Sequence, residues 1–269
     1  MTLLVGVLCS NGAVIAADRQ ASHGAFGHPT VGQPATKIKV IGQDTLFASS
    51  GAIGLNQQFS YIVESDQPQF KNRNYQSLVT LLQKKFRDVL EPAFKTAAAA
   101  RGLIGDAAQA DAICGSLLAS RYKDGLMLTE ISPQGGFEAL SKDIPFVCLG
   151  SGKQNADPFL RFIWSIYFDG ALPNLSEGSL AAYWTVKAVI ELLKSQGVGF
   201  TPDVFVLEQK GTEYVGRQLV SDELKGHDEY INEATQALLG IKNKIRGLGV
   251  PPPAAPPTMT VLHNPPNTK

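Results

Sequence analysis

The chain has 269 residues, and its 24 basic and 24 acidic side chains leave no formal net charge. This balance argues against a surface that holds nucleic acid or anionic lipid, so neither partner is expected. The amino-terminal segment lacks a basic stretch, and no run approaches the roughly 18 to 20 apolar residues of a membrane span. A cytoplasmic location is therefore expected, and the length allows one large domain with a full core.

The first fifty residues predict two hairpins. Leu3 to Cys9 and Ala13 to Asp18 are apolar runs separated by Ser10-Asn11-Gly12, and an Asn-Gly pair between such runs is a strong turn signal. After a segment rich in Gly, His and Pro, which predicts a loop, Lys37 to Ile41 and Thr45 to Ser50 form the second hairpin.

Helices and a second group of strands follow. Apolar residues recur at helical spacing from Ala52 to Glu64 and from Tyr75 to Ala100. Ile113 to Tyr122 and Leu126 to Ile131 then predict a hairpin, and Phe146 to Leu149 predicts a further strand.

The rest of the folded part repeats this order. Pro158 to Phe168 and Leu180 to Lys194 predict helices, Asp203 to Glu208 and Tyr214 to Leu219 predict strands, and Asp222 to Ile245 predicts a last helix. Strands and helices in blocks suit an α+β fold, not an alternating parallel one. We expect two antiparallel sheets between helix layers, a four-layer αββα sandwich. We expect this sandwich to form a single domain over residues 1–246, and we expect the Pro-rich segment 247–269 to be a flexible tail.

Thr2 is a candidate nucleophile. A chain that begins with Thr after removal of Met1 carries its own general base, because the pKa of an α-amine is about 7.7 to 8.0. A small side chain after Met1 also permits that removal without a propeptide. Position 2 by itself is weak evidence, since many cytosolic proteins carry Thr there.

The surrounding pattern adds a resemblance. The segments "TLLVGVLCSNGAVIAADRQAS", "TKIKVI" and "TLFASSGAIG" arrive in the order found in the opening of proteasome β-type subunits. The chain resembles this family of N-terminal nucleophile (Ntn) hydrolases, and in particular the proteobacterial homologues of the bacterial proteasome. The resemblance spans roughly residues 2–245 and is most specific in the first fifty.

The resemblance implies roles for five residues. Thr2 matches the nucleophile, Lys37 the adjacent cation and Asp18 the carboxylate that orients it. Gly51 matches the backbone N–H donor to the oxyanion, and Ser151 in "CLGSGK" matches a hydroxyl near the α-amine. The alternatives are a structural ion pair for Asp18 and Lys37, and simple turns for the Gly51 and Ser151 segments.

Lys39 is a competing candidate for the role of the cation beside Thr2. It stands two residues after Lys37, so the two side chains share one face of the strand. A phosphate-binding loop at "CLGSGK" fails, since Walker A requires glycine where Val147 stands and Ser or Thr where Gln154 stands.

Substrate contacts are also implied. The residues matching Ser22 and Gly51 pair with the extended substrate as an added strand, and Ala21, Ser49 and Ile53 are expected to line the side-chain pocket. A positive charge from Lys39 there would favour acidic or polar side chains.

One loop departs from the family pattern. Where the β-type subunits carry an Asp and a Ser, "KSQGVGFTPD" places Ser195 and Val198, which puts the efficiency of proton transfer in doubt. The three cysteines and the loop histidines His23 and His28 lack metal-ligand spacing, so no metal or organic cofactor is expected.

The leading hypothesis is a threonine peptidase that works through an acyl-enzyme on Thr2. The resemblance implies a homo-oligomer of stacked rings with peptide or unfolded protein as substrate, served by an unfolding ATPase that the sequence does not identify. Two alternatives stay open: an Ntn amidase or acylase acting on a small amide, and a structural ring subunit impaired by the changes at Ser195 and Val198.

Overall fold

The structure of the protein is a computed structural model. It describes residues 2–25, 28–105, 108, 112–168, 170–193 and 198–247, with the backbone alone for 22–25, 28–32 and 104. The chain forms two compact units, Met1–His227 and Asp228–Lys269. Every sheet and every predicted site residue belongs to the first unit, so the predicted single domain over 1–246 stays a prediction.

The first five-stranded sheet is antiparallel and carries the amino terminus. Its strand order is β10-β1-β2-β11-β12. The strands are β1 (Leu4–Cys9), β2 (Gly12–Ala17), β10 (Phe146–Leu149), β11 (Asp203–Lys210) and β12 (Glu213–Gln218). Each corresponds to a run that the sequence predicts as a strand, and β1 and β2 meet at the predicted Asn-Gly turn.

The second five-stranded sheet has the order β5-β6-β7-β8-β9. Its strands are β5 (Ile38–Ile41), β6 (Thr45–Gly51), β7 (Cys114–Tyr122), β8 (Gly125–Ile131) and β9 (Phe137–Ala139), and all neighbouring pairs are antiparallel. The predicted hairpins β5–β6 and β7–β8 are confirmed by their registers.

The segment predicted as a loop forms a third, two-stranded sheet of β3 (Gln20–Ala25) and β4 (His28–Pro34). Its register shifts between His23 and Gly24. The loop prediction was therefore wrong. The segment lacks the apolar alternation that marks a half-buried strand, and the shift breaks what periodicity remains, so its pattern carries no strand signal.

The two large sheets face each other across a shared core. One cluster of buried side chains includes Leu4 and Ile15 from the first sheet and Leu46 and Leu117 from the second. Because side chains alternate between the faces of a strand, this core uses only the inner face of each sheet. The outer faces are left for helices.

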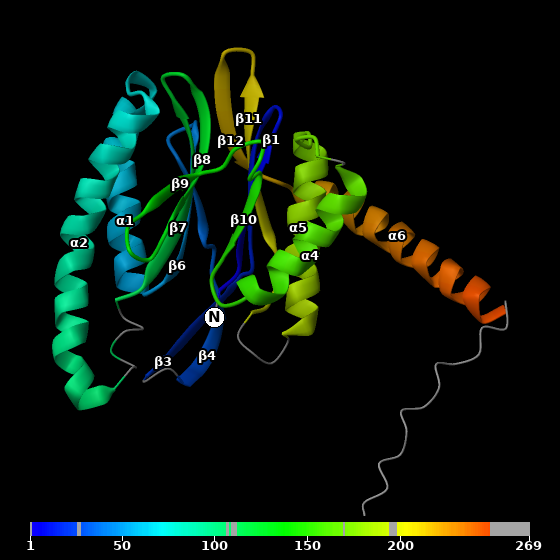
Figure 1. Ribbon diagram of the computed structural model, residues 1–269, viewed down its shortest axis with the longest axis horizontal. Coiled ribbons are helices and arrows are strands. Elements are labelled where there is room, and N and C mark those ends of the chain that lie inside the picture. The colour runs from blue at the N-terminus through cyan, green and yellow to red at the C-terminus, as the bar shows by residue number, and fades with distance from the viewer. Residues whose placement is uncertain are drawn as a thin grey trace, which may run out of the picture. The chain divides into compact units, whose positions relative to one another are not determined.

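Helices cover the outer face of the second sheet. α1 (Ile53–Asp66), the 3₁₀ helix η1 (Gln67–Asn72) and α2 (Tyr75–Ile104) share an apolar cluster with strands β6 to β8. Phe59 of α1 and Phe86 of α2 stack in it with ring centroids 4.1 Å apart. Figure 1 shows both helices on the side of β6 to β8.

On the first sheet, α5 (Leu175–Leu192) packs against β1, β2 and β11, and α4 (Lys153–Tyr167) packs against α5 and β10 (Figure 1). The predicted mixture of helices and antiparallel sheets is confirmed. The last helix, α6 (Ser221–Gly247), runs across the boundary between the two units. None of the described helices is both long and apolar enough to cross a membrane.

Candidate active site

Asp18 lies at the centre of the site and is completely buried. It directly follows β2, whose pairing with β1 brings it opposite Leu3. Its Oδ1 accepts hydrogen bonds from the Leu3 N–H and the Lys37 ammonium, both at 2.7 Å. Its Oδ2 accepts from the N–H groups of Gln20 at 3.0 Å and Gly199 at 3.5 Å. Four donors around one carboxylate satisfy a charge that would otherwise be costly to bury.

Lys37 stands directly before β5, and its side chain is only 9% exposed. Burial lowers the pKa of the Lys37 amine, while the Asp18 carboxylate acts in the opposite direction. Lys39 instead donates to Ser60 Oγ at 2.8 Å and to Glu64 Oε1 at 3.3 Å. Of the two candidate lysines, Lys37 is therefore the one that contacts Asp18.

Thr2 is held by the turn between β10 and α4. Its N–H donates to Ser151 Oγ at 3.2 Å, and its carbonyl accepts from the Gly152 N–H at 3.2 Å. Gly150 has a φ of +88°, and a Cβ there would lie 2.2 Å from the Thr2 carbonyl oxygen. Only glycine allows this approach. Thr2 N is an amide in the chain that carries Met1, and removal of Met1 would turn this nitrogen into the α-amine.

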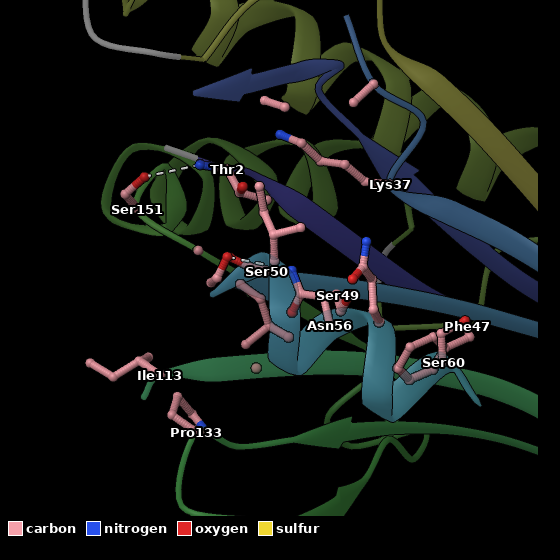
Figure 2. Close-up of a pocket in the computed structure, with 18 of the residues that line it drawn as sticks. Thr2, Lys37, Phe47, Ser49, Ser50, Asn56, Ser60, Ile113, Pro133 and Ser151 are labelled. Carbon is pink, nitrogen blue, oxygen red and sulfur yellow. Dashed lines mark hydrogen bonds between the residues drawn. The ribbon is translucent and has the colours of Figure 1, made fainter. Parts of the chain in front are cut away.

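Figure 2 shows the Lys37 side chain extending toward Thr2, with Ser151 on the other side of the Thr2 nitrogen. Thr2, Lys37 and Ser151 all line one pocket of about 870 Å³. Asp18 does not line this pocket and lies behind Lys37. A cation, a hydroxyl-bearing residue and a second hydroxyl thus meet at one opening.

The end of β6 supplies the opposite wall. Gly51 has a φ of +113°, and a Cβ there would lie 2.0 Å from the Ile113 carbonyl oxygen, so the position requires glycine. The Ala52 N–H donates to that same oxygen at 2.9 Å. Because antiparallel ladders alternate, the N–H groups of Ser49 and Gly51 point away from β7. β5 lies on the side to which these N–H groups point. The described pairing of β5 with β6 ends at Ile38 and Ala48, so it does not include Ser49 or Gly51.

Asn56 fixes this strand end and was not predicted from the sequence. Its Nδ2 donates to the Gly51 carbonyl at 3.4 Å, and its Oδ1 accepts from Cys114 Sγ at 2.8 Å. The side chain lines the pocket and connects α1 to β6 and β7. A polar residue one turn into a helix carries no signal of its own, because such positions are usually solvent-exposed.

Among the described residues, β3 of the third sheet pairs with β4 alone, so its other edge has no strand partner there. The Ala35 N–H bonds the Arg19 carbonyl, and the Gln20 N–H bonds Asp18, so alternate residues of β3 face away from β4. This alternation directs the backbone N–H and carbonyl of Ser22 away from β4. Nothing further is described for the Ser22 side chain.

The pocket gathers most of the predicted substrate-contacting residues. Ala21, Ser49, Gly51 and Ile53 all line it. Ser195 lies outside the described residues. Val198 is fully buried and offers no hydroxyl, and the neighbouring Gly199 N–H reaches Asp18 instead.

The cysteines are buried and free, and they are poor nucleophiles. Burial raises the pKa of the Cys9 and Cys114 thiols to about 12, and it raises the pKa of Cys148 well above its usual value. Among the described residues, no group of three or more His, Cys, Asp or Glu side chains is placed to hold a metal ion. The side chains of His23 and His28 lie outside the description.

Thiol alkylation is therefore expected to leave the native protein unmodified. At pH 8 a thiol of pKa about 12 is ionised in about one molecule in 10⁴, and the thiolate is the reactive form. Iodoacetamide should add no mass to the folded protein and three adducts to the unfolded one, as intact-mass spectrometry would show. Rapid modification of the native protein would contradict this expectation and point to a reactive thiolate.

Comparison with known proteins shows the fold. No protein-family model and no curated protein sequence matches the chain. Among solved structures, Anbu (ancestral beta-subunit) from Yersinia bercovieri matches with a TM-score of 0.65 and 19% identity, over 93% of this chain and 100% of that one. An Anbu mutant from Hyphomicrobium sp. strain MC1 matches with a TM-score of 0.63 and 17% identity, over 91% and 100%. A helical assembly of the Anbu complex from Pseudomonas aeruginosa matches with 0.63 and 19%, over 94% and 99%.

These matches correct the family inferred from the sequence. The structural neighbours named above are Anbu proteins, a family distinct from the proteasome β-type subunits. The assignment to the β-type family is therefore wrong. The hairpin pattern of the first fifty residues belongs to the shared fold, and so it did not separate the two families.

Proposed function

We propose that the protein is an N-terminal-threonine hydrolase that cleaves peptide bonds after loss of Met1. The observation that carries the proposal is the buried Lys37 ammonium, held by Asp18 and opening with Thr2 onto one pocket. A fixed positive charge beside a hydroxyl stabilises the developing alkoxide, and it also disfavours a second charge on the α-amine. The amine is thereby kept neutral and able to accept a proton.

The reaction proceeds through an ester on Thr2. The Thr2 Oγ1 attacks the peptide carbonyl carbon while the α-amine accepts the hydroxyl proton. The Gly51 N–H donates to the oxyanion, and the α-amine returns the proton to the leaving amine as the C–N bond breaks. Water then cleaves the ester and restores the hydroxyl. Ser151, whose Oγ lies 3.2 Å from Thr2 N, positions the amine throughout.

The substrate binds as an added strand. The backbone groups of Ser49 and Gly51 on one side and of Ser22 on the other face away from their sheet partners. An extended peptide between these edges satisfies them and places its carbonyl beside Thr2. The apolar side chains that line the pocket then surround one substrate side chain.

The proposal includes a four-layer αββα arrangement, which the shared core between the sheets and the helices on each outer face support. It also includes self-association of this chain. The helical assembly of the Pseudomonas aeruginosa protein makes an open, non-closing arrangement the alternative to stacked rings. A chamber of either kind would need an unfolding partner to supply protein substrates.

Intact-mass analysis before and after treatment with a threonine-directed β-lactone tests the proposal. The expected result is a chain that lacks Met1 and gains one adduct, which peptide mapping places on Thr2. The Thr2→Ala variant should gain none. Retained Met1, or an adduct on another residue, would contradict the assignment. Hydrolysis of small non-peptide amides without cleavage of any peptide would show that the protein is an amidase and not a peptidase.

A further inference from the structure

The pocket beside Thr2 has a positive lining. Three lysines line it, and the carboxylate that pairs with each of them does not. The three pairs are Lys37 with Asp18, Lys39 with Glu64, and Lys153 with Asp157. One carboxylate, Glu130, is itself part of the lining. A substrate side chain that enters the pocket therefore meets more ammonium groups than carboxylates, which favours an anionic group.

Lys39 is the cation available to such a group. Its Nζ donates to Ser60 Oγ at 2.8 Å and lies 3.3 Å from Glu64 Oε1, and Ser60 Oγ donates to the same carboxylate oxygen at 3.0 Å. The Lys39 and Glu64 side chains are 54% and 44% exposed. An exposed pair of this kind contributes little, so a second carboxylate can replace Glu64 on the ammonium at small cost.

The position of Lys39 fits the residue on the acyl side of the cleaved bond. Lys37 and Lys39 are two residues apart on one extended segment, so their side chains leave the same face about 7 Å apart. Lys37 extends toward Thr2, and Lys39 lines the same pocket one repeat further along this segment. Figure 2 shows Phe47 and Ser60 toward one end of the pocket and Ile113 and Pro133 toward the other. The first end is the one that contains Lys39.

We propose that this end of the pocket selects an acidic side chain at the residue whose carbonyl Thr2 attacks. The Lys39 ammonium binds the substrate carboxylate, Ser60 donates a hydrogen bond to it, and Phe47 and Ile53 contact the apolar stem. A basic side chain would instead meet Lys39 directly, because Glu64 does not line the pocket. This inference rests on the proposed function and names the substrate class of the same site.

A matched set of fluorogenic peptides tests the inference. The peptides differ only at the residue before the cleaved bond, with Glu, Gln, Leu or Arg. For the unmodified protein, kcat/KM for Glu should exceed that for Gln by about tenfold, since Gln has the same shape without the charge. Lys39→Met should bring this ratio near one, because it removes the ammonium that distinguishes Glu from Gln. Glu64→Gln should raise the ratio, because it removes the competing carboxylate.

Lys84→Met provides the control, since Lys84 is an exposed lysine of α2 that does not line the pocket. It should leave all four rates unchanged. A Glu-to-Gln ratio near one in the unmodified protein, or a ratio that Lys39→Met leaves intact, overturns the inference while the peptidase assignment stands. Absence of cleavage of every peptide together with absence of Thr2 labelling overturns the proposed function, and this inference with it.

Discussion

Replacing Thr2 with alanine is expected to lower kcat/KM for peptide cleavage by about 10⁴-fold or more. The variant keeps the α-amine, the Lys37 ammonium and the Gly51 donor, but it has no oxygen with which to form the ester. Ser49, Ser50 and Ser151 also line the pocket, and none of them carries the α-amine that serves as base. Steady-state hydrolysis of a fluorogenic peptide, with the background of buffer subtracted, gives the ratio.

Two further variants make this result specific. Thr2→Ser keeps the nucleophilic oxygen and should retain activity and inhibitor labelling. Thr80→Ala removes a hydroxyl from α2 that bonds the Gln76 carbonyl and should leave kcat/KM unchanged. Appreciable activity in Thr2→Ala would transfer the role of nucleophile to one of the pocket serines.

Replacing Asp18 with alanine is expected to lower the free energy of unfolding by about 3 to 5 kcal/mol and to abolish threonine labelling. The variant leaves the Lys37 ammonium, with a side chain 9% exposed, without its carboxylate. It also removes the acceptor of three backbone N–H groups, those of Leu3, Gln20 and Gly199. Urea denaturation measures the loss of stability, and intact-mass analysis measures the labelling rate in the folded fraction.

Asp66 offers a matched control. It is 2% exposed, and its Oδ1 lies 2.7 Å from Lys85, the same separation as between Asp18 and Lys37. The Lys85 side chain is 39% exposed, so water solvates it once its partner is gone and Asp66→Ala should cost less stability. Because Asp66 and Lys85 do not line the pocket, Asp66→Ala should be labelled at the same rate as the unmodified protein. Equal labelling in Asp18→Ala and Asp66→Ala would reduce Asp18 to a structural ion pair.

The local pattern of the chain predicted most of the elements. Alternating or continuous apolar runs around Asn-Gly and similar turns predicted β1–β2, β5–β6 and β7–β8, and helical spacing predicted α1 and α2. These signals are local because they depend only on which face of an element is buried. The hairpin β3–β4 was not predicted, because its Gly, His and Pro residues form no regular apolar face.

The family could not be inferred in the same way. The segments around Thr2, Asp18 and Lys37 build the hairpins that hold the site, and proteins of two families carry such hairpins on one fold. Asn56 was missed for a related reason. Its contacts with Gly51 and Cys114 join three elements that lie far apart in the sequence.

The sequence alone predicted that a threonine precedes the first predicted strand, that an aspartate ends the second and that two lysines share one face of the third. Only the tertiary structure decided which lysine meets the aspartate. Packing of α1 beside β5 places Ser60 and Glu64 within hydrogen-bonding distance of Lys39. The buried end of β2 places Asp18 next to Lys37. The physical reason is that residue spacing sets the direction of a side chain, whereas its partner depends on which distant elements pack against it.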